Sequence, residues 1–212
     1  RAGELVPVLS TFGLAIVLDN SMFTHFGADT RSLAPYIGTL GYDSWTLPGD
    51  LIVGKLPLIT FAVAVVLLGG LHLLLHHTAL GRRIRAATVD PDTAQLVGVN
   101  ARAVYAAATA IAMMTVAIAG AFQAMRATFD PYIGGQLLIF AFEAVVIGGA
   151  GSLWGTLVGG IVLGVAQSIG AQIRPQGFLI AGHAVFLVIL VARLYVTRDM
   201  HHFFRLFRKR AL

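Results

Sequence analysis

Histidines and carboxylates are the side chains of this largely apolar chain that could bind a metal ion or transfer protons. His72 and His76 are four residues apart, with His77 beside them, and two histidines at that spacing on one helix face can hold a metal ion. The chain has no cysteine, and no acidic residue lies near these histidines. We therefore interpret these three residues, at the inner end of their helix, as interface histidines. We interpret His183, in the last span, as an interface histidine too, and predict no metal site.

Two carboxylates, Asp19 and Glu143, stand inside apolar segments. Ionisable groups are costly in a membrane, and they commonly line a transport path or pair with another group. Asp19 lies two-thirds along its segment and could equally stand near the outer surface. Glu143 has Phe142 and Val145 close by, and both a gating role and a structural hydrogen bond or ion pair stay open for it. Our hypothesis is that Glu143 supports the fold or a gate and is no proton relay.

Glycines are concentrated after Glu143. Small residues spaced four apart let helix backbones approach closely in lipid, so we predict a role in helix packing or gating. These glycines are Gly148, Gly149, Gly151, Gly155, Gly159, Gly160 and Gly164. The stretch GGAGSLWG resembles a phosphate-binding loop but lacks the Lys-Ser/Thr that such a loop requires. With no Ser-His-Asp or paired-carboxylate arrangement either, we predict no catalytic site and no cofactor.

The elements that position these residues are apolar segments long enough for a membrane. Hydrophobic residues make up 57% of the 212 residues and charged residues only 12%, about half the usual globular share. The mean hydropathy is +0.81. The net charge of +5 comes from basic residues between and after apolar runs, which favours membrane orientation over nucleic-acid binding. The fold class is therefore an all-α polytopic integral membrane protein.

Six apolar segments are predicted as transmembrane or partly spanning helices. They cover residues 5–26, 52–75, 104–125, 137–149, 155–172 and 178–196. A span needs about 20 residues, so segment 137–149 is short. It is either a half-helix or the start of a helix that continues through the glycines.

Charge placement predicts the orientation. The loop 78–103 and the tail 197–212 are basic, whereas the loop 27–51 carries three aspartates against one arginine. The positive-inside rule places the loop 78–103 and the tail in the cytoplasm, and alternation of the spans places 27–51 and 126–136 outside.

The polar loop between the second and third spans has its own helix signals. Asp90 followed by Pro91 is typical of an N-cap and a first helical position, and Gly98 would end the helix. We expect one short helix here. Two interpretations stay open: a coupling helix that docks into a cytosolic motor subunit, or an amphipathic loop on the membrane surface.

A set of residues in the loop and downstream of it forms a pattern. In the loop these residues are Gly81, Arg82, Arg85, Ala86, Asp90, Pro91, Ala94, Leu96, Gly98 and Asn100. Downstream come Ala119-Gly120, Pro131, Gly134 and the stretch Phe142 to Gly164. Together, the loop and the glycine-rich stretch resemble the permease subunits of branched-chain amino acid ABC importers. The resemblance begins near Thr11 and covers most of the chain.

The resemblance implies a single transmembrane permease domain over 1–212, N-terminally incomplete, in the bacterial inner membrane. Its implied partners are cytosolic ATP-binding subunits at the loop 78–103, a second homologous permease, a periplasmic or tethered substrate-binding protein, and the lipid bilayer. ATP hydrolysis would belong to the partners, and the cargo would be branched-chain amino acids. Alternatives are urea, short amides or sugars as cargo, a stand-alone secondary transporter, and a scaffold that transports nothing.

One departure from the family pattern concerns the last span. Family members often end it with Arg-Pro-x-Gly, whereas Arg193 is followed here by Leu194 and Tyr195. We expect the tail to dock differently and the function to be unchanged.

Overall fold

The structure is a computed structural model that describes residues 2–49, 51–174 and 176–210, with side chains described for 9–46, 48–49, 52–174 and 176–195. The helices are α1 (Ala2–Phe26), η1 (Ala34–Tyr36), η2 (Gly38–Gly41), α2 (Lys55–His77), α3 (Ala79–Val89), α4 (Pro91–Leu96), α5 (Ala101–Arg126), α6 (Ile133–Gly148), α7 (Leu153–Ile173) and α8 (Gly177–Arg210). The strands are β1 (Ser44–Leu47) and β2 (Leu51–Gly54). The chain forms two compact units, 1–133 and 134–212, and each is described by itself.

Four of the described helices are long and apolar enough to cross a membrane. They are α2, α5, α7 and the part of α8 from Gly177 to Tyr195. The predicted all-α polytopic membrane fold is confirmed, with β1–β2 as a small addition. Helix α1 has 25 residues, but its apolar run is interrupted by Asp19 and Asn20.

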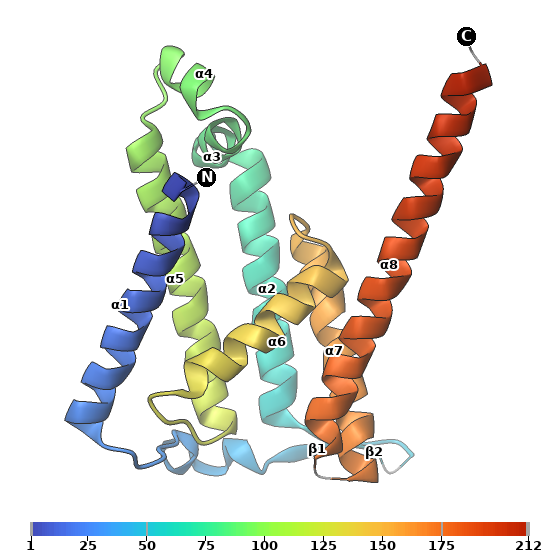
Figure 1. Cartoon of the computed structure of the whole chain (residues 1–212). Helices are drawn as coiled ribbons and strands as arrows, with labels where there is room; N and C mark the ends of the chain where they lie inside the picture. The colour runs from blue at the N-terminus through green and yellow to red at the C-terminus, as the bar shows by residue number, and fades with distance from the viewer. Residues whose placement is uncertain (1, 50, 175, 211–212) are drawn as a thin grey trace. The chain divides into compact units, whose positions relative to one another are not determined.

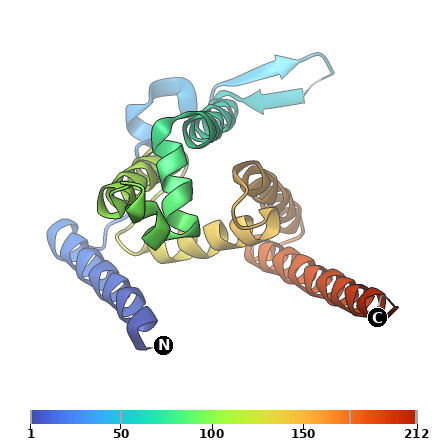
Figure 2. The same cartoon turned by 90° about the horizontal axis from the view of Figure 1, so that it is seen from above.

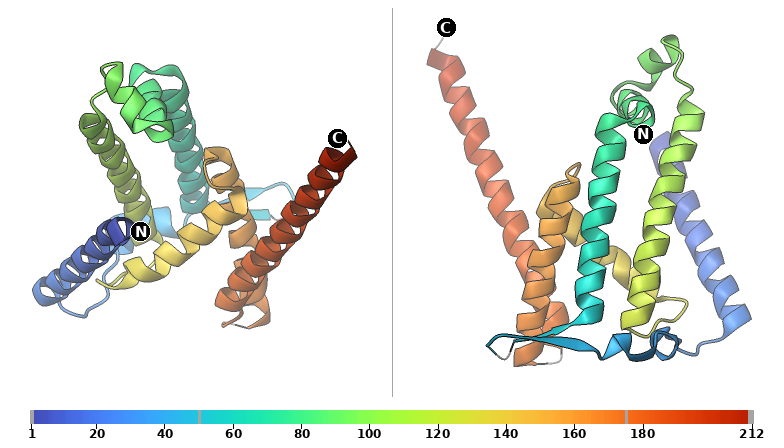
Figure 3. Two further views of the ribbon diagram at one scale, coloured as in Figure 1. Left: turned by 45° about the horizontal axis from the view of Figure 1, so that its top comes forward. Right: turned by 180° about the vertical axis from the view of Figure 1, so that it is seen from behind.

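In the first unit, helices α2 and α5 carry short elements at both ends. Figures 1 and 3 show α3 and α4 at one end of these helices, and η1, η2 and the β1–β2 ribbon at the other. At the ribbon end, the Arg31 amide donates to the Phe129 carbonyl and the Phe129 amide to the Arg31 carbonyl, both at 2.8 Å. The segments after α1 and after α5 are therefore bonded to each other.

The apolar segment predicted at 52–75 contains two elements. Its first residues form β2, which pairs antiparallel with β1, and α2 begins at Lys55. Figure 2 shows the ribbon extending sideways from the end of α2. The helix therefore begins within a few residues of the predicted boundary. Ile52 and Val53 form a strand because they are β-branched and pair with a strand that the loop supplies.

In the second unit, α6 ends at the glycines. Gly149 and Gly151 both have a φ of +94°, a backbone conformation that glycine adopts most readily. The Ser152 side chain then caps α7 by accepting a hydrogen bond from the Gly155 amide at 3.0 Å. Helix α6 therefore does not continue into α7, and its 16 residues span about 24 Å at 1.5 Å per residue.

Helix α8 follows α7 after a short turn, and the two helices pack along each other. The backbone of α8 stays helical to Arg210. The side chains of the basic tail predicted at 197–212 lie outside the described residues.

Candidate functional site

The polar loop between α2 and α5 forms two helices where one was expected. Helix α3 was missed, because its cap is a threonine three residues before a glycine and gives no capping-box signal. The Thr78 hydroxyl accepts a hydrogen bond from the Gly81 amide at 3.1 Å and starts the helix. The residues that follow, LGRRIRAA, contain strong helix formers.

Helix α3 is fixed to the end of α2. A Cβ atom on Gly81 would overlap the backbone carbonyl oxygens of Leu74 and Leu75, so the close approach of the two helices requires glycine there. The Arg85 guanidinium donates to the Leu75 carbonyl, which is among the last carbonyls of α2 that lack a partner within the helix.

Helix α4 begins and ends where the sequence predicts. The Asp90 carboxylate accepts hydrogen bonds from the Asp92 and Thr93 amides, both at 3.1 Å, and from the Thr93 hydroxyl at 2.5 Å. After α4, Gly98 has a φ of +86° and donates to the Gln95 carbonyl at 3.0 Å. These bonds fix both ends of a helix of only six residues.

The Asp90 cap gives the loop a defined response to acid. The hydrogen bond from the Thr93 hydroxyl, with those from the Thr93 and Asp92 amides, holds the pKa of Asp90 below its usual value. A lowered carboxyl pKa stabilises α4 fully above the unfolded pKa, and the effect is lost as the pH falls through the folded pKa. We expect hydrogen exchange of the α4 amides, corrected for intrinsic rates, to accelerate only in that acid range.

Asp90→Asn is the matched control, because asparagine caps helices as well as aspartate does and does not titrate. Acid acceleration of the same size in the Asp90→Asn variant would contradict the assignment to Asp90.

Small side chains are buried inside the loop, and large apolar side chains are exposed on part of its outer surface. Ala87 and Ala94 are buried, and the Tyr105 hydroxyl donates to the Ala87 carbonyl at 3.2 Å, which connects α5 to α3. On the outside, Leu96 is 87% exposed and Val97 is 77% exposed. Val89, at the end of α3, is also 87% exposed. Exposed large apolar side chains close together on one loop mark interaction surfaces, and Leu96 and Val97 are neighbours in the chain.

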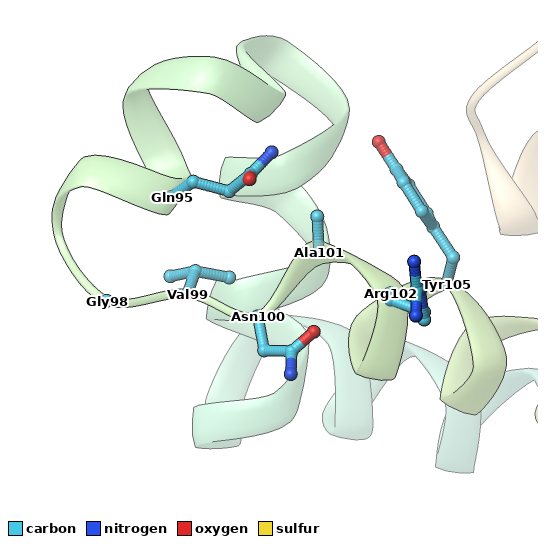
Figure 4. A pocket seen from close by; sticks show the side chains of 7 residues that line it. All are labelled: Gln95, Gly98, Val99, Asn100, Ala101, Arg102 and Tyr105. Carbon is cyan, nitrogen blue, oxygen red and sulfur yellow. The ribbon is translucent and has the colours of Figure 1, made fainter.

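An open hollow lies beside this apolar surface, between α4 and the start of α5. Figure 4 shows the residues that line it: Gln95, Gly98, Val99, Asn100, Ala101, Arg102 and Tyr105. Several of its polar groups already serve the loop. The Asn100 side chain accepts from the Ala103 amide at 3.1 Å, and the Gln95 side chain donates to the Pro91 carbonyl at 3.2 Å. These two side chains are therefore already engaged within the loop.

The structure places the predicted loop residues in two groups. Gly81 and Ala94 are buried within the loop. The exposed ones are Arg82, Arg85, Ala86, Asp90, Pro91, Leu96, Gly98 and Asn100. The exposed group is available to a partner, and the buried pair holds the loop together.

The glycines after Glu143 also fall into groups. A Cβ atom on Gly148 would overlap the Gly155 carbonyl oxygen, one on Gly155 would overlap that of Gly148, and one on Gly159 would overlap that of Ala144. The backbones of α6 and α7 therefore touch along this line. Gly149 and Gly151 lie in the turn, whereas a Cβ atom on Gly160 or Gly164 would meet nothing within 4 Å.

Glu143 is paired with His183. The Glu143 residue is only 3% exposed, and its Oε1 lies 2.5 Å from Nδ1 of His183 on α8, whose side chain is 44% exposed. Among the described residues Glu143 Oε2 has no hydrogen-bond partner. The Phe140 ring stacks on the His183 ring, with centroids 5.7 Å apart and planes 7° from parallel.

His183 lies in the last span, as the sequence predicts, but its pairing with Glu143 was not foreseen. The residue lies inside α8, where it contacts α6. A buried carboxylate in a neighbouring apolar segment was the available signal, because such a group needs a partner.

Other contacts in the second unit were also missed. A Cβ atom on Gly170 would overlap the Gly177 carbonyl oxygen, and one on Gly177 that of Gly170, so α7 and α8 approach closely at their turn. Arg193 donates to the Val146 carbonyl at 3.0 Å, one of the last carbonyls of α6. A cation at that end of a helix is favourable, so α8 supports the short helix α6.

The histidines of α2 contact each other. The His72 and His76 rings stack with centroids 4.1 Å apart, and His76 Nδ1 lies 2.9 Å from the His72 carbonyl oxygen. Among the described residues, no three or more histidines, cysteines or carboxylates lie close enough together to hold a metal ion. Asp19 is half-buried on α1.

Comparison with known proteins identifies relatives along most of the chain. The permease protein BraD of a high-affinity branched-chain amino acid transport system in Pseudomonas aeruginosa is 29% identical over 90% of this chain and 63% of its own length. The LivH permease of Escherichia coli is 26% identical over 89% of this chain and 62% of its own length. A probable LivH of Methanocaldococcus jannaschii is 30% identical over 64% of this chain and 44% of its own length.

The chain thus spans less than two thirds of the length of these curated relatives. No solved structure matches it. The family described as "Branched-chain amino acid transport system / permease component" matches residues 3–195. With that match over nearly its whole length, the chain belongs to the family of permease components of branched-chain amino acid transport systems.

Proposed function

We propose that the chain is the membrane-spanning permease subunit of an ATP-driven importer, and that α3 and α4 dock onto a cytosolic ATP-binding subunit. The observation that carries this proposal is the exposed apolar pair Leu96 and Val97 on a loop whose ends are fixed to two membrane helices. A fixed loop can pass a displacement on to those helices, whereas a flexible loop would absorb it.

The path from the docking surface to the membrane runs through few contacts. Helix α4 is joined to α3 through the Asp90 cap, and α3 to α2 through Gly81 and the bond from Arg85 to Leu75. On the other side, the Tyr105 hydroxyl joins α5 to α3. When the ATP-binding subunit moves α4, both α2 and α5 follow.

The family supports the cargo and the remaining partners. The relatives are described as branched-chain amino acid permeases, and we propose the same class of cargo here. We also propose two further partners, a second homologous permease and a substrate-binding protein at the outer face. The proposed location is the bacterial inner membrane. The two units of the chain would act as one permease domain. ATP hydrolysis belongs to the partner subunits.

The contacts at the ends of α2 and α5 support the orientation. The segments 27–51 and 126–136 were both predicted outside, and the paired amides and carbonyls of Arg31 and Phe129 join them. The loop 78–103 lies at the opposite end of α2 and α5 (Figure 3), which suits a cytoplasmic position.

Leu96→Asp tests the docking surface. Burial of a leucine side chain contributes about 1.5–3 kcal/mol, so its replacement by a charge should weaken binding of the ATP-binding subunit roughly ten- to hundredfold. The measurement is the amount of ATP-binding subunit retained on the tagged permease of the complete transporter in mild detergent, together with leucine uptake into vesicles. Both should fall.

Thr88→Asp is the matched control, since it adds the same charge to an exposed position of the same loop outside the apolar pair. Ala94 is a poorer test, because it is buried and a charge there would unfold the loop. Full retention with Leu96→Asp would remove the docking assignment. Uptake that survives ATP depletion at a clamped membrane potential would favour a secondary transporter, and uptake of urea or a sugar in place of leucine would change the cargo.

A further inference from the structure

The β1–β2 ribbon has one apolar face that the proposed function does not use. In the antiparallel register Trp45 lies opposite Val53, and Leu47 opposite Leu51. Residues directly opposite each other, and residues two apart along a strand, share a face. Of the residues whose side chains are described, Trp45 and Val53 therefore share one apolar face. The other face carries Ser44, Thr46, Ile52 and Gly54.

The ribbon lies at the boundary of a membrane helix. Strand β2 ends at Gly54, and α2, a candidate span, begins at Lys55. No linker separates them, so the ribbon starts where the chain enters the hydrocarbon. Figures 1 and 2 show the ribbon running across the end of α2 and extending sideways from it, which is the direction of a bilayer surface.

The charges at the base of the ribbon neutralise each other. Lys55 Nζ lies 2.9 Å from Asp43 Oδ2, and the hydrogen bond from Lys55 holds the pKa of Asp43 below its usual value. The Lys55 ammonium also stands 6.0 Å from the centre of the Trp45 ring. The described ribbon residues, 44–49 and 52–54, include no charged side chain; Asp50, in the turn, lies outside the described residues.

From these observations we infer that the ribbon is an interfacial anchor, whose apolar face lies against the lipid at the level where acyl chains meet headgroups. Tryptophan is enriched at this level because its ring is apolar and its N–H is polar. Trp45 is 49% exposed. Lipid covers its ring without the ribbon leaving the plane in which α2 ends, whereas a soluble protein would have to reach into that plane.

The experiment uses the fluorescence of Trp45 in the complete transporter, reconstituted into phosphatidylcholine vesicles. The chain has two tryptophans, so Trp154→Phe leaves Trp45 as the one reporter within it, and tryptophans of the partner subunits are subtracted with a Trp45→Phe, Trp154→Phe transporter. The lipids carry bromine either near the headgroup end of the acyl chain or near its methyl end. We expect Trp45 to lose most of its emission to the shallow bromine and little to the deep one.

Aqueous iodide is the complementary quencher. Strong iodide quenching with no loss to brominated lipid would overturn the inference, because Trp45 would then face water. Protection from both quenchers would also overturn it and would indicate that protein covers the ribbon. Iodide quenching that disappears when the substrate-binding protein is added would identify a protein docking surface in its place.

Discussion

Gly159→Ala is expected to destabilise the contact between α6 and α7, whereas Gly160→Ala, one residue later, is not. A Cβ atom on Gly159 would overlap the Ala144 carbonyl oxygen and come close to the Gly148 amide. These are backbone atoms, so a whole helix has to shift to make room. Overpacking of this kind costs about 1–3 kcal/mol and occasionally more. A Cβ atom on Gly160 would meet nothing within 4 Å.

The measurement is the free energy of unfolding in detergent, compared between the two variants. Gly160→Ala should be neutral or stabilising, since alanine is favoured over glycine in a helix interior by about 1 kcal/mol. Gly164→Ala is a second control with the same open surroundings. Equal effects at Gly159 and Gly160 would show that the α6–α7 contact does not depend on the missing Cβ.

The same variants separate a packing role from a gating role. Gly148, Gly155 and Gly159 lie on the line where α6 and α7 touch. If these glycines only pack, uptake should fall in proportion to the loss of stability. A fall in uptake with an unchanged free energy of unfolding would assign them to gating.

The membrane helices were predictable because long apolar runs leave little choice in lipid. The backbone hydrogen bonds of a spanning segment must be satisfied internally, which dictates helices. The Asp90 cap and the Gly98 stop were predictable for a local reason, since each acts within a few residues. The strand β2 before α2 was not predictable, because Ile52 and Val53 fit an apolar helix and a strand equally well and only the pairing with β1 decides.

The contacts between helices could not be predicted from spacing alone. The sequence indicated a run of small residues but not which of them touch, since Gly159 and Gly160 are equivalent by type and only the helix face differs. Likewise, Glu143 called for a partner, and several histidines were available along the chain. His183 is the partner because α8 packs against α6. The two residues are 40 positions apart in the chain, so local sequence could not indicate the pairing.

The Glu143–His183 pair should respond asymmetrically to substitution. His183→Phe keeps a ring beside Phe140 but removes the hydrogen bond, which leaves the buried Glu143 without a partner on either oxygen. Removing one partner of a buried pair costs about 3–5 kcal/mol. Glu143→Met leaves only His183, whose side chain is 44% exposed, so the loss of stability should be smaller. The double variant should recover most of the loss seen with His183→Phe.

A thermodynamic cycle over these variants measures the pair itself. Because the double variant should recover most of a loss of about 3–5 kcal/mol, we expect a coupling free energy of about 2 kcal/mol or more, above the average of about 0.6 kcal/mol for hydrogen bonds between membrane helices. A coupling of zero, or a larger loss for Glu143→Met than for His183→Phe, would contradict the paired geometry.

Glu143→Gln then distinguishes a supporting role from a proton relay. The glutamine amide oxygen can still accept a hydrogen bond from His183 Nδ1, but the side chain no longer titrates. Because we propose that Glu143 holds α6 against α8, we expect uptake to persist with an unchanged dependence on pH. Arg193 also joins these helices, and Arg193→Gln should lower stability without changing the pH dependence. Loss of uptake in Glu143→Gln with a shifted pH profile and intact assembly would show that the carboxylate carries protons.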